Sequence, residues 1–175
     1  FLTIMKVLED ETFGRGPLRT PANLDRIGRV LRAVAPLVSR SVGDTEHSRA
    51  LVEQLLAPDS IREIRAQVFS PKPAGLTSVF RDDNPFYESP LAATTHFLVA
   101  DSAGNIVCAT QSQSLHFGAG VVPPGTGVVM NDSMRNFAYT NPASVNYVAP
   151  GKRARSTIAP TIVLRDGKPV FALGI

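Results

Sequence analysis

The stretch TTHFLVADSAGNIVCAT at residues 94–110 decides the fold of this chain. Two apolar runs flank the polar turn at residues 102–105, and this pattern predicts a β-hairpin with strands over 94–101 and 105–114. The first strand opens on Thr94. If the chain is cut before this residue, its free α-amine can act as a base for its own hydroxyl, which makes Thr94 a candidate nucleophile. Thr-Thr is also a common start of an ordinary β-strand. The hairpin alone therefore leaves both interpretations open, a nucleophile and a plain strand residue.

The chain before this hairpin has the period of helices. Residues 1–70 predict four of them: one near the N-terminus, one opening at Pro21, one from Ser48 to Leu56, and one capped by Asp59 or Ser60. Pro36 should bend or interrupt the second helix. The apolar side chains that would share a face in the first, second and fourth helices are Leu2, Met5 and Leu8, then Leu24, Ile27, Leu31 and Val34, and then Ile61, Ile64 and Val68.

After Ala93 the period becomes that of strands. Residues 127–130 predict a short strand, and residues 161–165 and 170–173 predict a second hairpin around the turn Asp166-Gly167. Residues 70–93 read as a surface linker, because four prolines and a charged cluster interrupt them. A bond that is to be cut should follow such a segment. We therefore expect an α+β protein with a helical part over residues 1–93 and a β-rich part over residues 94–175. The linker prolines and charged residues are Pro71, Pro73, Pro85, Pro90, Arg81, Asp82 and Asp83.

Composition excludes several classes of function. The 175 residues are 43% hydrophobic with a net charge of +3, which indicates a globular chain, and the scattered basic residues give no support for nucleic-acid binding. No apolar run is long enough to span a membrane. The single cysteine, Cys108, should be a small buried residue, and no cluster has metal-ligand spacing, so we expect no cofactor. The chain begins at Phe1 and ends within an apolar strand, so we expect it to be an interior piece of a longer protein.

Five separate pieces of the sequence together resemble a known family. The first piece begins at Thr94, and the other four are residues 117–132, 150–153, 156–163 and 166–169. In this order and spacing they resemble the small subunit of γ-glutamyltranspeptidases, and residues 1–93 resemble more loosely the end of the large subunit. The resemblance implies a fragment of a four-layer αββα N-terminal-nucleophile hydrolase sandwich. It also implies large and small subunits cut from one precursor, a γ-glutamyl or related acyl-amide substrate such as glutathione, and a periplasmic or secreted location.

The resemblance also implies roles for individual residues. Thr94 would attack the carbonyl of Ala93 during self-cleavage and a γ-glutamyl amide during turnover. Ser112 matches a hydroxyl residue that hydrogen-bonds the nucleophile, although a solvent-facing position is an equal alternative. Ser156 and Thr157 match a Ser-Ser pair that holds the substrate α-carboxylate. His96 lies two residues after Thr94 on the same face, where packing or a structural hydrogen bond is favoured over a role as catalytic base.

Three positions depart from the family pattern. Ser114 replaces an Asn, Ser133 replaces a Gln or Glu, and Asn136 replaces an Asp that pairs with the substrate α-ammonium. A neutral Asn makes a weaker bond to that cation, and Arg135 adds positive charge nearby, so these changes favour a glutaryl-like acyl group. A simple turn-capping role for Asn136 is the alternative.

Two rival readings therefore stay open: a cephalosporin-acylase-like amidohydrolase of the same fold, and an unprocessed, non-catalytic relative. The family's oxyanion Gly-Gly pair would follow residue 175 and its large-subunit Arg would precede Phe1. We therefore expect this fragment alone to be nearly inactive, since loss of an oxyanion donor costs about 10²–10³ in rate.

Overall fold

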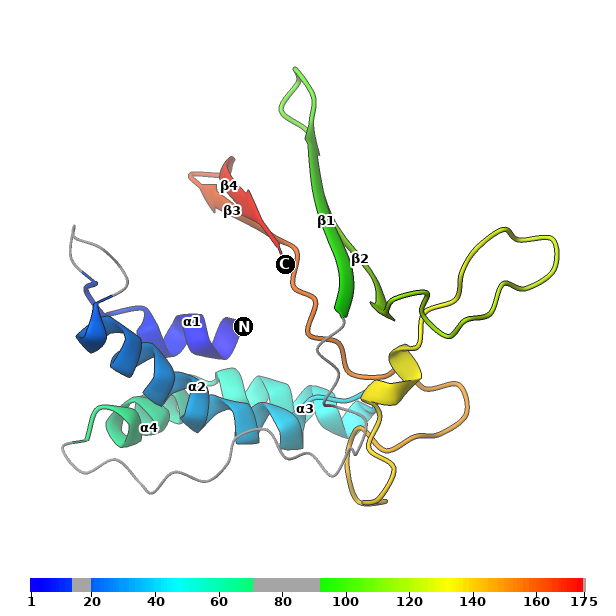
Figure 1. The fold of residues 1–175 in the computed structure, drawn as a ribbon. Coiled ribbons are helices and arrows are strands. Elements are labelled where there is room, and N and C mark those ends of the chain that lie inside the picture. Colours follow the sequence, from blue (N-terminus) through cyan, green and yellow to red (C-terminus); the bar gives the residue numbers. More distant parts are fainter. Residues whose placement is uncertain (14–19, 71–91, 175) are drawn as a thin grey trace. The chain divides into compact units, whose positions relative to one another are not determined.

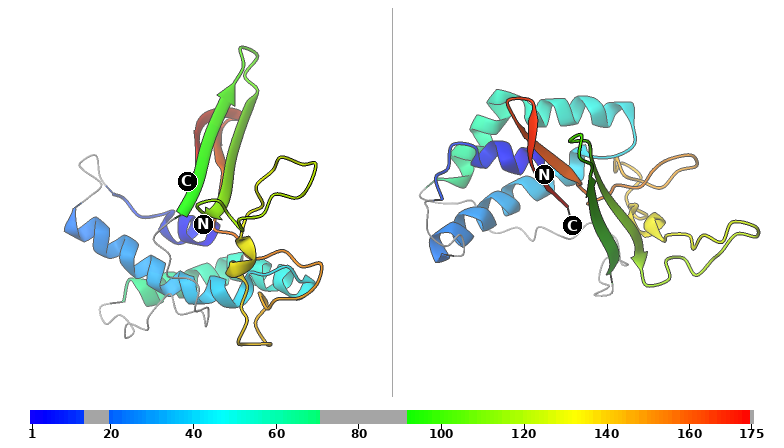
Figure 2. Two further views of the ribbon diagram at one scale, coloured as in Figure 1. Left: turned by 45° about the vertical axis from the view of Figure 1, so that its right-hand side comes forward. Right: turned by 90° about the horizontal axis from the view of Figure 1, so that it is seen from above.

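The computed structural model describes residues 1–13, 20–70 and 92–174. The chain is α+β, as the sequence predicts, and it forms two compact units. The first unit consists of the described residues in the ranges 1–83 and 138–153. The second consists of those in the ranges 84–137 and 154–175. Figures 1 and 2 show the helices of the first unit and the two hairpins of the second. The predicted division of the chain into residues 1–93 and 94–175 refers to cleavage of the Ala93–Thr94 bond, and it stays a prediction.

Four helices make up the first unit: α1 (Leu2–Leu8), α2 (Pro21–Ser41), α3 (Glu46–Leu56) and α4 (Pro58–Val68). The hydroxyls of Thr20 and Thr45 accept the backbone N–H of the third residue beyond them, which caps the start of α2 and of α3. One apolar face of each helix then packs into a shared core. The buried core residues are Val7, Val30, Val34, Leu55, Ile61, Ile64 and Val68.

The helices correct three details of the sequence prediction. Helix α2 continues through Pro36 to Ser41, because its buried face outweighs the one lost backbone bond. Helix α4 begins at Pro58 after Ala57, so Asp59 and Ser60 lie inside its first turn and do not cap it. The buried faces of α1 and α2 are also rotated from the predicted ones, since Leu2, Met5, Leu24 and Leu31 are exposed while Val7 and Val30 are buried. The burial of Val34 and of the α4 residues Ile61, Ile64 and Val68 is confirmed.

The second unit holds two antiparallel hairpins: β1 (Ala92–Ala100) with β2 (Ile106–Leu115), and β3 (Thr161–Arg165) with β4 (Lys168–Leu173). Both were predicted, with ends displaced by at most two residues. Asp166 and Gly167 have φ values of 51° and 75°, which is the left-handed pair that a tight hairpin turn requires. At the other turn the Asp101 carboxylate accepts the N–H groups of Ala103 and Asn105, and its hydrogen bonds to Asn105 lower the pKa of Asp101.

The remaining predictions fall outside regular structure. Residues 127–130 form no strand, although the backbone N–H of Met130 donates to the carbonyl of Val121. Almost all of the predicted 70–93 linker, with its prolines and its charged cluster at residues 81–83, lies outside the described residues. No helix in the described ranges is both long and apolar enough to cross a membrane.

Candidate active site

Thr94 lies beside an irregularity in the first hairpin. Ala93 pairs with Ser114 and Thr94 pairs with Ser112, so Gln113 is an extra residue in β2 and forms a bulge opposite the Ala93–Thr94 bond. Ser114 takes a φ of 72°, in the left-handed region that residues other than glycine rarely adopt. The regular ladder is therefore interrupted at the bond that the sequence predicts to be cut.

The bulge brings three groups onto the hydroxyl of Ser112. Its Oγ lies 2.9 Å from Thr94 Oγ1 and 3.4 Å from the carbonyl oxygen of Ala93, and it accepts the backbone N–H of Ser114 at 3.0 Å. Ser112 has one proton to donate. When that proton points to the Ala93 carbonyl, Thr94 Oγ1 donates its own proton to Ser112. The arrangement can therefore hold the predicted nucleophile and polarise the adjacent carbonyl at the same time.

Further along the same face, His96 is held by its own partners. Its Nδ1 lies 2.8 Å from Thr110 Oγ1, and its Nε2 lies 3.6 Å from the Sγ of Cys108. The Cys108 thiol also points to the Leu173 carbonyl at 3.4 Å, so this partly buried cysteine joins the two hairpins. Both ring nitrogens of His96 are thus engaged away from Thr94, which fits a structural hydrogen-bonding role.

Ser133 and Asn136 lie on the 3-10 helix η1 (Ser133–Asn136), which is tied to the end of β2. The backbone N–H of Asp132 donates to the Gln113 carbonyl at 3.2 Å, and Asp132 Oδ1 accepts the N–H of Leu115 at 3.3 Å. Asp132 also forms an ion pair with Arg135 at 3.7 Å. Because of this tie, η1 lies next to the bulge, and the positive charge of Arg135 is partly offset by a carboxylate.

Ser156 and Thr157 are exposed and precede β3. The Oγ of Ser156 accepts the N–H of Ile158 at 3.1 Å, which forms a local turn. Among the described hydrogen bonds, none joins this pair to Thr94 or Ser112. The structure therefore brings Thr94, Ser112 and Ser114 together and ties η1 to the same strand, and it leaves Ser156 and Thr157 as a separate prediction.

Sequence reasoning missed the bulge and the Asp132 tie. The polar run at residues 111–114 signals an irregular strand end, but it does not say which residue is extra. It also missed Gly174, where a Cβ atom would lie 2.3 Å from the His96 ring. In the part of the chain that the structure describes, no group of histidine, cysteine and acidic residues could hold a metal ion.

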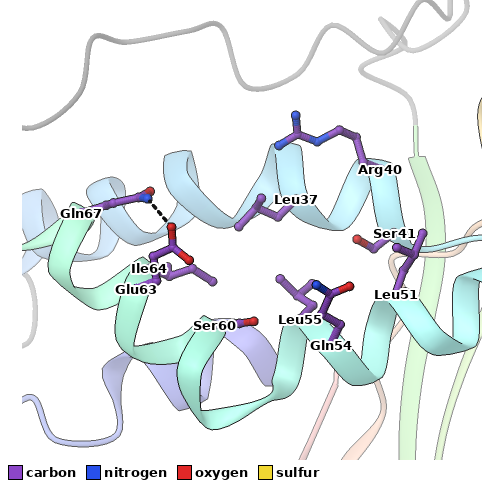
Figure 3. Close-up of a pocket in the computed structure, with 10 residues that line it drawn as sticks. All are labelled: Leu37, Arg40, Ser41, Leu51, Gln54, Leu55, Ser60, Glu63, Ile64 and Gln67. Carbon is purple, nitrogen blue, oxygen red and sulfur yellow. Dashed lines mark hydrogen bonds between the residues drawn. The ribbon is translucent and has the colours of Figure 1, made fainter.

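A cavity of about 250 Å³ lies elsewhere, between α2, α3 and α4 in the helical unit (Figure 3). Leu37, Leu51, Leu55 and Ile64 form its apolar wall, and Gln67 donates a hydrogen bond to Glu63 at its rim. None of the predicted site residues lines it. The candidate site is therefore the strand end at Thr94 and not this cavity.

Comparison with known proteins places this geometry in context. A glutathione hydrolase proenzyme of Bacillus subtilis subsp. natto is 30% identical over 185 residues, which cover 99% of this chain and 31% of that protein. The acylase ACY 1 proenzyme of Pseudomonas sp. strain SE83 is 46% identical over 84 residues, covering 48% of this chain and 15% of that protein. The solved γ-glutamyltranspeptidase of Pseudomonas nitroreducens is 36% identical, with a TM-score of 0.41 and 45% of each chain covered.

This chain thus spans less than a third of the length of these two curated relatives. The model of one family, described as gamma-glutamyltranspeptidase, matches residues 1–175. Since that match covers the whole chain, this chain belongs to the γ-glutamyltranspeptidase family.

Proposed function

We propose that the protein containing this chain is a self-processing amide acyltransferase or hydrolase that forms its acyl-enzyme on Thr94 and acts on γ-glutamyl amides such as glutathione. One observation carries the proposal: the Ser112 hydroxyl lies within hydrogen-bonding distance of both the Thr94 hydroxyl and the Ala93 carbonyl. A hydroxyl nucleophile, its neighbour and the bond to be cut thus meet at one bulge. Large and small subunits would then come from one precursor.

Self-cleavage follows from this geometry. Thr94 Oγ1 attacks the carbonyl carbon of Ala93, the new C–O ester bond replaces the peptide C–N bond, and the hydroxyl proton passes to the departing nitrogen. Ser112 accepts a hydrogen bond from the attacking hydroxyl and donates one to the carbonyl oxygen as negative charge develops there. Water then hydrolyses the ester and leaves a carboxylate on Ala93 and a free α-amine on Thr94.

Turnover would reuse the same hydroxyl. The free α-amine of Thr94 takes the hydroxyl proton while Oγ1 attacks the amide carbonyl of the substrate, and it then gives this proton to the amine portion as the amide C–N bond breaks. Water or an acceptor amine then takes the acyl group. We assign contacts with the bound acyl group to Ser114, Ser133 and Asn136, and contact with its α-carboxylate to Ser156 and Thr157. No cofactor is required by these steps.

The intact mass of the full-length protein tests the proposal, with Thr94→Ala as the variant that lacks the nucleophile. We expect two fragments that meet between Ala93 and Thr94, and a single chain in the variant. A Thr95→Ala control should still be cut, since Thr95 lies on the opposite face of β1. A single uncut wild-type chain would overturn the proposal and favour a non-catalytic relative that keeps only the fold.

A second candidate function is an acylase that prefers dicarboxylic acyl groups lacking an α-amine. Asn136 favours it, because a neutral side chain stands where the resemblance implies an acid, on a short helix whose N-cap residue Asp132 is bonded to the end of β2. The 46% identity to an acylase proenzyme over 84 residues adds support. Turnover of a γ-glutamyl anilide against a glutaryl anilide separates the two candidates, since the acylase should prefer the glutaryl compound.

A further inference from the structure

We propose that residues 138–153, here called the docking loop, hold the two processed fragments together by binding Gly43 and Asp44 of the first fragment. The inference rests on the proposed self-cleavage at Ala93–Thr94, because only that cut places the docking loop and Gly43 in different chains. Both belong to the same compact unit, although they lie on opposite sides of the cut in the sequence.

The docking loop has its own internal structure. The N–H of Ala138 donates to the carbonyl of Asn146 at 3.0 Å, and the N–H of Val148 donates back to the carbonyl of Ala138 at 3.1 Å. Lys152 Nζ donates to the carbonyl of Tyr147 at 2.9 Å. Asn146 is only 1% exposed, whereas residues 141–143 are exposed, so the loop is buried at Asn146 and open to solvent before it. Because its shape is fixed by its own bonds, the loop can dock as a preformed element at low entropic cost.

A steric fit forms the first part of the contact. Gly43 lies between α2 and α3, and a Cβ atom there would lie 2.2 Å from the carbonyl oxygen of Val145 and 3.2 Å from the nitrogen of Asn146. These are backbone atoms, so they can move only if the whole docking loop moves. Only glycine permits this approach, and the backbone of α2–α3 therefore lies directly against the loop.

An ion pair forms the second part. The backbone N–H of Arg153 donates to Asp44 Oδ2 at 2.8 Å, and its guanidinium donates to Oδ2 and Oδ1 at 3.2 Å each. These bonds from Arg153 lower the pKa of Asp44, which keeps the carboxylate ionised. The Arg153 side chain is 87% exposed, so its charge is screened by water and salt. The ion pair therefore fixes which residues of the docking loop and of the α2–α3 connection face each other. The close contact at Gly43 makes the surfaces of these two segments complementary in shape.

The test uses the processed full-length protein and measures how fast the small fragment is released at a fixed urea concentration. We expect Gly43→Ala to speed release at least tenfold. Gly28→Ala is the matched control, since a Cβ at Gly28 within α2 meets nothing within 4 Å. Asp44→Arg and Arg153→Asp should each speed release, and the exchange of both charges should restore part of the loss. Equal release rates in Gly43→Ala and wild type would overturn the proposal.

The Thr94→Ala protein, which we expect to stay uncut, separates this proposal from the proposed function. In this protein a double-mutant cycle between Asp44→Asn and Arg153→Lys on the unfolding midpoint tests the docking contact. The test holds even if the wild-type chain is never cut and self-processing fails. Non-additive shifts support the contact in the unbroken chain. Additive shifts, together with an unchanged midpoint in Gly43→Ala, would reject it.

Discussion

The Ser112 hydroxyl carries a single proton and lies within reach of Thr94 Oγ1, the Ala93 carbonyl and the Ser114 N–H. In the proposed self-cleavage it stabilises the oxyanion that forms on Ala93. We expect Ser112→Ala to slow self-cleavage by about 10², which is the usual cost of one lost oxyanion donor. Ser112→Thr keeps the hydroxyl and should process within a few-fold of wild type. The time course of fragment formation by intact mass measures both.

Two results decide whether Ser112 acts through its hydroxyl. Thr95→Ala, on the opposite face of β1, controls for a general weakening of the hairpin. If Ser112→Ala and Thr95→Ala slow cleavage equally, the effect is structural. If Ser112→Ala is processed at the wild-type rate, Ser112 has no role in cleavage and its contact with Thr94 is incidental.

The second prediction at the residue scale concerns the charge at position Asn136. Asn136→Asp restores a negative charge on η1, and a charged hydrogen bond to an ammonium is stronger than a neutral one by about 1 kcal/mol. The ratio of kcat/KM for a γ-glutamyl anilide over a glutaryl anilide should therefore rise about fivefold. An unchanged ratio would mean that Asn136 does not face the acyl group and serves only the turn that it ends.

The predicted hairpin is present, and its register pairs Thr94 with Ser112. The roles of these two residues follow from the family resemblance and stay predictions. The bulge at Gln113 could not be foreseen, because one extra residue changes the partner of Ser114 without changing the polar pattern of the strand. The tie from Asp132 to β2 was equally hidden, since its partners on β2 are the backbone carbonyl of Gln113 and the backbone N–H of Leu115, which no residue type signals.

At the scale of elements, the helices and both hairpins were predicted, and their boundaries and faces were less accurate. Apolar period gives the presence of α2, but the choice between Leu31 and Val30 as the buried residue depends on how α1, α3 and α4 pack. Pro36 predicts a break only for an isolated helix. In α2 the buried Val30 and Val34 before Pro36 and the partly buried Leu37 and Val38 after it pack against the shared core, so packing overrides local preference.

The two hairpins meet where Gly174 lies against the His96 ring. A Cβ at Gly174 would lie 2.3 Å from His96 Cε1 and Nδ1, so Gly174→Ala must displace the ring or the end of β4. We expect this variant to lower the unfolding midpoint of the full-length protein and to slow self-cleavage, because His96 is two residues from Thr94. His96→Ala removes the ring, so adding Gly174→Ala to it should cost little further. Thermal unfolding and intact mass measure the four proteins of this cycle.

The cycle has a clear negative outcome. If the effects of Gly174→Ala and His96→Ala simply add, the two residues do not press on each other, and the described bonds from Cys108 remain to join the hairpins. If instead the double variant loses little more than His96→Ala alone, the contact between ring and backbone is the one that Gly174→Ala disturbs.

On the scale of the molecule, the sequence predicts α+β correctly, but a four-layer sandwich needs larger sheets than the two-stranded ones that the described residues form. The described sheets have two strands each, and Phe97, Val99, Val107 and Phe171 are exposed on them. Such open apolar faces are typical of strands that pack against further layers. We expect the rest of the full-length protein to cover them, since this chain spans less than a third of the length of the Bacillus subtilis subsp. natto glutathione hydrolase proenzyme and of the ACY 1 acylase proenzyme.

The association of the processed fragments should depend on pH through Asp44. Its pKa is held below the ordinary value of 3.8 by hydrogen bonds from Arg153, so folding and docking favour the ionised form. A lowered pKa contributes stability that is fully present above the ordinary pKa and is lost as the pH falls through the lowered one.

Asp44→Asn removes this contribution. At pH 7 the variant should therefore release its small fragment in urea faster than wild type, and the difference should shrink as the pH falls below 3.8. High salt at pH 7 should shrink it as well, because the pair is exposed. A difference that is the same at pH 7 and at pH 3 would mean that Asp44 acts through its shape and not through its charge.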